Sequence, residues 1–200
     1  MKGNEIMKKK IVTLSLVVAL AATAVIGGTL AYFTDTDEKT NVLTVGNVDI
    51  ILTEPGWEET GKEEAKDAYP GEALAKDPTV TNDGANPCFV RVKVEWDETI
   101  GEMEYRTNYE SGKLGDGWVD GNDGYFYYAH VLEIGATTDA LFDQIVVSKD
   151  LTNDNTDTEY NVVVSAQAVQ AQGAKASWAD VQNMTVEEIA AWFDTCGMNN

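Results

Sequence analysis

The chain has 200 residues, with 14 Lys and Arg against 34 Asp and Glu, a formal net charge of −20, and 44% hydrophobic residues. A charge this negative disfavours nucleic-acid phosphates and anionic membrane surfaces as partners, because both would be repelled. The length suits one domain with a core of adequate size.

Residues 1–31 have the pattern of an export signal. Lys2 and Lys8–Lys10 form a basic start, residues 11–26 form an apolar run, and two glycines follow. Small residues then stand at the −3 and −1 positions of a cleavage site, Thr29 and Ala31, so the pattern predicts cleavage between Ala31 and Tyr32. The alternative is an uncleaved membrane anchor, but the 16-residue run is shorter than the roughly 18 to 20 residues that span a bilayer. We therefore expect a secreted protein with no stable membrane anchor after cleavage.

Cleavage would leave one mature domain, residues 32–200, that is more acidic than the whole chain. Four of the 14 basic and one of the 34 acidic residues lie in residues 1–31, so the remaining 169 residues have 10 basic and 33 acidic side chains and a net charge near −23. This negative charge is compatible with binding of calcium or of a cationic wall component. Solubility outside the cell explains the negative charge without any ligand.

Short β-strands dominate the mature chain. The clearest is 88–96, where Cys88, Val90, Val92, Val94 and Trp96 alternate with Phe89, Arg91, Lys93 and Glu95. This alternation predicts a strand with one buried and one wet face, as in antiparallel sheets. The other predicted strands, in chain order, are 45–53, 78–82, 103–109, 125–134, 142–148 and 160–171.

Turn signals separate these strands, and one helix is predicted near the C-terminus. In the predicted helix 184–195, Thr185 and Glu188 have the spacing of a capping box. The stretch 54–77 is acidic and poor in aliphatic residues, so we interpret it as a solvated loop insertion with a helical turn near 63–68. Many short strands without intervening long helices predict an all-β fold, an antiparallel jelly-roll-like β-sandwich with a short C-terminal helix.

Two cysteines, Cys88 and Cys196, stand in a chain expected to be exported, where a disulfide is permitted. A bridge between them would tie the C-terminal segment to the core. Two separate thiols are the alternative, and the sequence leaves both open.

The residues provide no recognisable catalytic constellation. His130 is the only histidine, so the HExxH motif of zinc peptidases cannot occur, and no GxSxG elbow is present. We therefore predict no catalytic residue and no cofactor. The weak exception is calcium, because Asp116, Asp120 and Asp123 lie in one glycine-rich stretch, although Asp-Gly turns explain them equally well.

Several segments resemble a known family. The signal and junction "MKKKIVTLSLVVALAATAVIGGTLAYFTDTDEKTNVLTVGNVDI" resemble export signals processed by the dedicated signal peptidase SipW. The segments "PGEALAKDPTVTNDGANPCFVRVKV", "DGYFYYAHVLEIGATTDALFDQIVV" and "YNVVVSAQAVQAQGA" are similar to those of the TasA and camelysin family of Gram-positive bacteria. The resemblance covers about residues 7–178.

The resemblance implies a secreted structural protein of the biofilm matrix or cell surface. In TasA-like fibres an N-terminal segment adds as a strand to the neighbouring subunit. The corresponding segment here is Tyr32–Asn47, with Tyr32, Phe33, Leu43 and Val45 as its apolar residues. The implied partners are further copies or paralogous subunits, together with a SipW-type signal peptidase. The alternatives are a surface module that does not polymerise and a camelysin-like metallo-endopeptidase, to which no residue here can be assigned.

Overall fold

The computed structural model describes residues 47–96, 104–151 and 161–198, all of which belong to one compact unit, Val45–Asn200. This part of the chain is mostly β, with few helices. None of its helices combines the length and the apolar character that a membrane span requires. In chain order the elements are β1 (Ile50–Thr53), η1 (Trp57–Gly61), α2 (Lys62–Glu64), η2 (Ala65–Asp67), β2 (Ala73–Ala75), β3 (Thr79–Asn82), β4 (Cys88–Trp96), β5 (Glu104–Thr107), β6 (Glu110–Ser111), β7 (Trp118–Asp120), β8 (Phe126–Tyr128), β9 (Gln144–Val146), β10 (Val162–Gln170), α3 (Trp178–Gln182) and α4 (Val186–Thr195).

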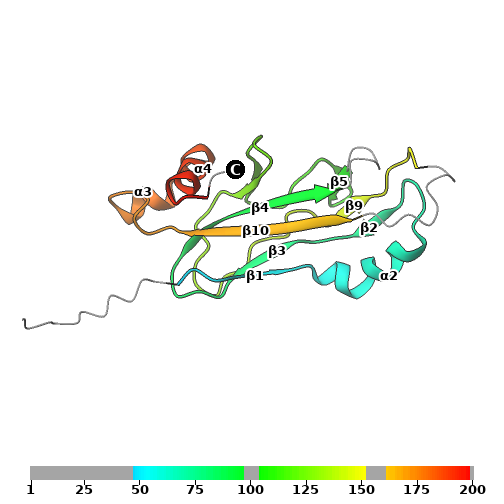
Figure 1. Ribbon diagram of the computed structural model, residues 1–200, viewed down its shortest axis with the longest axis horizontal. Helices are drawn as coiled ribbons and strands as arrows, with labels where there is room; N and C mark the ends of the chain where they lie inside the picture. Colours follow the sequence, from blue (N-terminus) through cyan, green and yellow to red (C-terminus); the bar gives the residue numbers. More distant parts are fainter. Residues whose placement is uncertain (1–46, 97–103, 152–160, 199–200) are drawn as a thin grey trace, which may run out of the picture. The chain divides into compact units, whose positions relative to one another are not determined.

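Within the described ranges the strands form three antiparallel sheets, with the orders β1-β3, β10-β4-β8-β7 and β2-β9-β5-β6. The longest pairing joins β4 and β10, from Trp96 opposite Val162 to Cys88 opposite Gln170. Figure 1 shows these two strands side by side, β4 in green and β10 in orange. β1 pairs with β3 from Ile50 opposite Asn82 to Thr53 opposite Thr79.

The two four-stranded sheets share an inner core, and the alternation predicted for 88–96 is confirmed on this side. Cys88, Val90 and Val92 have no exposed surface. They pack with Leu74, Ile145 and other apolar residues of the second sheet. Val164, Ala166 and Ala168 of β10 pack against the same core, as the period-two pattern predicts.

The outer face of β4 is not wet along its whole length, which corrects the prediction. Phe89 and Arg91 are only 1% and 2% exposed. They lie beneath the C-terminal helices, whose Ile189 and Phe193 complete a second core with Tyr127 and Val169. Figure 1 shows α3 and α4, orange to red, at the end where β10 leaves the sheet. The predicted C-terminal helix is confirmed as α4, with its capping box between Thr185 and Glu188.

The stretch 54–77 is not the loop that its charge suggested. It contains a run of helical turns, η1, α2 and η2, followed by β2, which pairs with β9. The helical segment packs closely on β2, since a Cβ on Gly61 would lie 2.1 Å from the Ala75 carbonyl oxygen. Lys76 is buried and donates to Glu54 Oε2 at 2.9 Å. The acidic side chains of the helical turns are exposed, and only the turn near 63–68 was expected.

Other strands are shorter than predicted, and some elements were not predicted. The strand expected at 125–134 is β8 alone, because the chain bends after Tyr128 and Leu132 makes only an isolated bridge to Cys88. β6, β7 and α3 had no strong pattern of their own: β6 has two residues, β7 three and α3 five.

Candidate functional site

The described chain begins at a closely packed anchor. The backbone of Asp83 donates to the Asp49 carbonyl at 3.0 Å, and that of Ala85 donates to the Asn47 carbonyl at 2.9 Å. A Cβ on Gly84 would lie 2.6 Å from the Asp49 nitrogen, so only glycine allows this approach. The first described residues are thus held by their own domain, and Asn47 belongs to this anchor.

The side chain of Asn82 shapes the anchor from within. Asn82 has no exposed surface. Its amide donates to the carbonyls of Asn86 and Leu132, at 2.9 and 3.0 Å, and its carbonyl oxygen accepts from the Gly84 nitrogen at 3.0 Å. The turn signal at Asn82-Asp83-Gly84 is therefore a fixed structure where the N-terminal segment enters the domain.

The residues predicted to act in export and assembly lie outside the described ranges. These are the cleavage-site residues Thr29, Ala31 and Tyr32 and the assembly residues Phe33, Leu43 and Val45. What the structure adds is a strand edge without a pairing partner in the described ranges, with β1 packed close by. β10 pairs with β4 over nine residues, and its other edge pairs with no strand among the described residues. Val163, on its outer side, is 53% exposed.

The three aspartates considered for calcium are not brought together. Asp120 and Asp123 lie in the β7–β8 turn, where their carboxylates accept from Asn122 N at 2.8 Å and Tyr125 N at 3.0 Å. Asp116 precedes β7. In the described parts of the chain no group of three or more His, Cys, Asp or Glu side chains could hold a metal ion.

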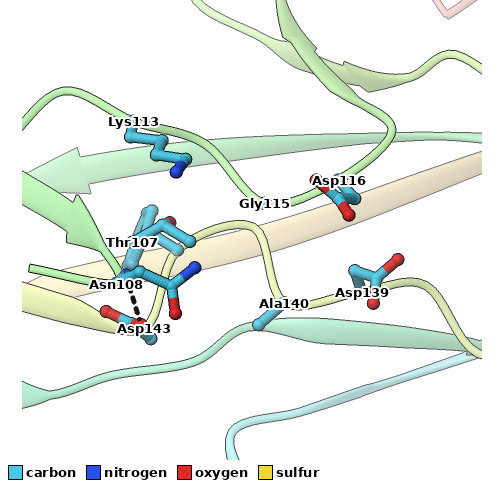
Figure 2. A pocket seen from close by; sticks show the side chains of 9 residues that line it. Thr107, Asn108, Lys113, Gly115, Asp116, Asp139, Ala140 and Asp143 are labelled. Carbon is cyan, nitrogen blue, oxygen red and sulfur yellow. Dashed lines mark hydrogen bonds between the residues drawn. The ribbon is translucent and has the colours of Figure 1, made fainter. Parts of the chain in front are cut away.

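Asp116 instead lines a pocket of about 250 Å³ between the β5–β6 hairpin and the segment 139–143. Figure 2 shows Asp116 and Asp139 at one end and Asp143, Asn108 and Lys113 at the other. Ala140 and the fully buried Phe142 also line the pocket. The backbone of Asn108 donates to Asp143 Oδ2 at 2.8 Å.

The pocket is electrostatically negative. Lys113 is its only lining cation, and its ammonium pairs with Glu110 Oε1 at 3.0 Å. Two oxygens of lining residues, Thr107 Oγ1 and Asp143 Oδ1, are buried and accept no hydrogen bond. Beyond the pocket wall, burial and then the Asp139 carboxylate raise the pKa of Tyr128 above its usual value.

Four of these polar residues escaped sequence reasoning: Thr107, Asn108, Asp139 and Asp143. The pocket draws on residues 107–116 and 139–143, which are more than 20 positions apart, and periodicity does not relate the two segments. The only local signal is the left-handed turn at Asn108-Tyr109, where φ is 52° and 65°. Asparagine is one of the residues that tolerate this conformation.

The disulfide considered between Cys88 and Cys196 is absent, and both thiols are free. Cys88 is buried in the inner core, whereas Cys196 is exposed at the end of α4, which packs on the outer face. The sheet itself therefore lies between the two side chains. Burial raises the pKa of Cys88 to about 12.

His130 does not lie in a ligand set. It is exposed just after β8, and its ring meets that of Tyr128 edge-on at 5.6 Å between centroids. A zinc peptidase site needs three protein ligands around the metal. The described residues do not fit that requirement, because the chain has one histidine and no ligand group gathers in these ranges.

A protein-family model described as camelysin metallo-endopeptidase matches residues 6–112, more than half of the chain. No curated protein and no solved structure matches the chain significantly. The matched range includes most of the export-signal pattern and the strands through β6, which confirms the resemblance read from the sequence. The chain therefore belongs to the camelysin family of cell-surface proteins.

Proposed function

We propose that this protein is a secreted structural component of the matrix or surface of a Gram-positive bacterium. In this proposal a SipW-type peptidase cleaves after Ala31, and the mature protein folds as a jelly-roll-like β-sandwich. Its N-terminal segment then adds as a strand to a neighbouring subunit, a second copy or a paralogue. Membership of the camelysin family supports the surface location.

The observation that carries the assembly proposal is the edge of β10 that pairs with no described strand, although β1 packs close to β10. An edge strand presents unpaired N–H and C=O groups that can pair with an added strand. β10 is nine residues long, so its backbone could form hydrogen bonds with most of a donor segment from a neighbouring subunit. The anchor at Asn47 limits the donor to the residues before it, since Asn47 already accepts from Ala85.

Assembly can be tested by comparing protein that begins at Tyr32 with protein that begins at Gly46. Fibres in electron micrographs of the first and none of the second are expected. Equal assembly of both would rule out donation by this segment.

The acceptor edge can be tested separately with Val163→Lys, because a charged side chain on an edge strand opposes strand addition. Val119→Lys is the matched control, since Val119 is similarly exposed, at 40% against 53%, on β7 at the other edge of the same sheet. Only Val163→Lys should reduce fibre formation. If both variants assemble like the parent, β10 is not the acceptor.

A metallo-endopeptidase is the second candidate function, and the description of the matching family model favours it. Purified mature protein would be incubated with casein, with and without a chelator. Chelator-sensitive cleavage that disappears in His130→Ala would establish this function. The same activity in His130→Ala would instead indicate a contaminating protease.

A further inference from the structure

We draw no further inference here: the strongest candidate, the pair of exposed apolar side chains Ile51 and Val163 on the closely packed strands β1 and β10, belongs to the strand edge already proposed as the acceptor, and nothing in the described residues shows what else covers it.

Discussion

On the inner face of β4, Val90 and Val92 pack against the other sheet in a core without charge. On the outer face of the same strand, Phe89 and Arg91 lie beneath α4, and the buried group there is a cation. Further along the outer face, Lys93 and Glu95 pair at 2.8 Å in contact with solvent. One alternating strand therefore has three environments, and the sequence pattern distinguishes only inner from outer.

Arg91 has partners of an unusual kind for a buried cation. Its guanidinium carbon lies 3.8 Å from the centre of the Tyr125 ring and 4.6 Å from that of Phe193. Its nitrogens donate to Gln167 Oε1 at 2.8 Å, Tyr127 Oη at 3.2 Å and the Met198 carbonyl at 2.6 Å. The nearest link to a carboxylate among these contacts is indirect, since Tyr127 Oη donates to Asp123 at 2.7 Å. Aromatic faces and neutral oxygens thus stabilise the charge and join the C-terminal segment to the sheet.

The largest expected effect comes from removing the aromatic side chain that joins α4 to the outer face. Phe193 has no exposed surface and packs on Tyr127 at 5.9 Å between ring centroids. Phe193→Ala should lower the free energy of unfolding by about 3–5 kcal/mol. Hydrogen exchange should accelerate most in α4.

Leu141→Ala is the inner-face counterpart, because Leu141 is also fully buried but belongs to the inner core. It should cost about 2–5 kcal/mol and accelerate exchange in β9. If Phe193→Ala accelerates exchange equally in α4 and β9, the two cores are not separable.

Arg91→Lys should have the next largest effect. Lysine keeps the charge but has one nitrogen, so it cannot donate to three oxygens while stacking between two rings. We expect a loss of about 1–3 kcal/mol in urea denaturation. Lys93→Arg, further along the same face, should change stability by less than about 0.5 kcal/mol. Equal stability of Arg91→Lys and the parent would show that charge alone stabilises the contact.

The capping box gives a smaller effect. The Glu188 nitrogen donates to Thr185 Oγ1 at 3.3 Å, and Glu188 Oε2 accepts from the Thr185 nitrogen at 3.1 Å. Thr185→Ala should cost about 1 kcal/mol and Thr185→Ser much less. Thermal melts that show the same loss for both variants would contradict a role for the hydroxyl.

The contribution of Glu188 in α4 to the pH dependence of stability should be smaller still. The hydrogen bond from Lys175, and then that from the Thr185 backbone, lower the pKa of Glu188 below its ordinary value of 4.5. Its contribution to stability is therefore complete above about pH 4.5 and is lost as the pH falls through the lower pKa of the folded state. Denaturation curves of Glu188→Gln should lack this part of the acid dependence, whereas an unchanged acid dependence would exclude it.

The reactivity of the two thiols distinguishes the inner and outer sides of the sheet, and measuring it requires no substitution that would change stability. Iodoacetamide at pH 8 should label Cys196 alone in the native protein, because burial raises the pKa of Cys88 to about 12. Burial also raises the pKa of Cys196, so its labelling should be slower than that of a free thiol. Mass spectrometry should find the second label only after unfolding. Two labels on the native protein would mean that the inner core opens readily.

Local patterns predicted the parts of the fold that depend on neighbouring residues. The alternation in β4 and β10 and the Thr185–Glu188 spacing needed only a few consecutive positions. The burial of Arg91 could not be predicted, because it depends on α4, which begins 95 positions later. The stretch 54–77 was misinterpreted because its many exposed carboxylates hid three buried positions, Gly61, Leu74 and Lys76. The pocket required the tertiary structure, since its two segments, 107–116 and 139–143, meet only in the folded protein.

The anchor at Asn82–Gly84 has a mechanical consequence. A load applied along β1 would act on four residues that pair with β3 in antiparallel register. If the opposing load acts at Thr79, the other end of β3, the force shears all four pairs at once, and the contacts of the Asn47 and Asp49 carbonyls bear it first. Replacing Gly84 would weaken this junction at the point where the load enters the domain, because a Cβ there would push Asp49 away.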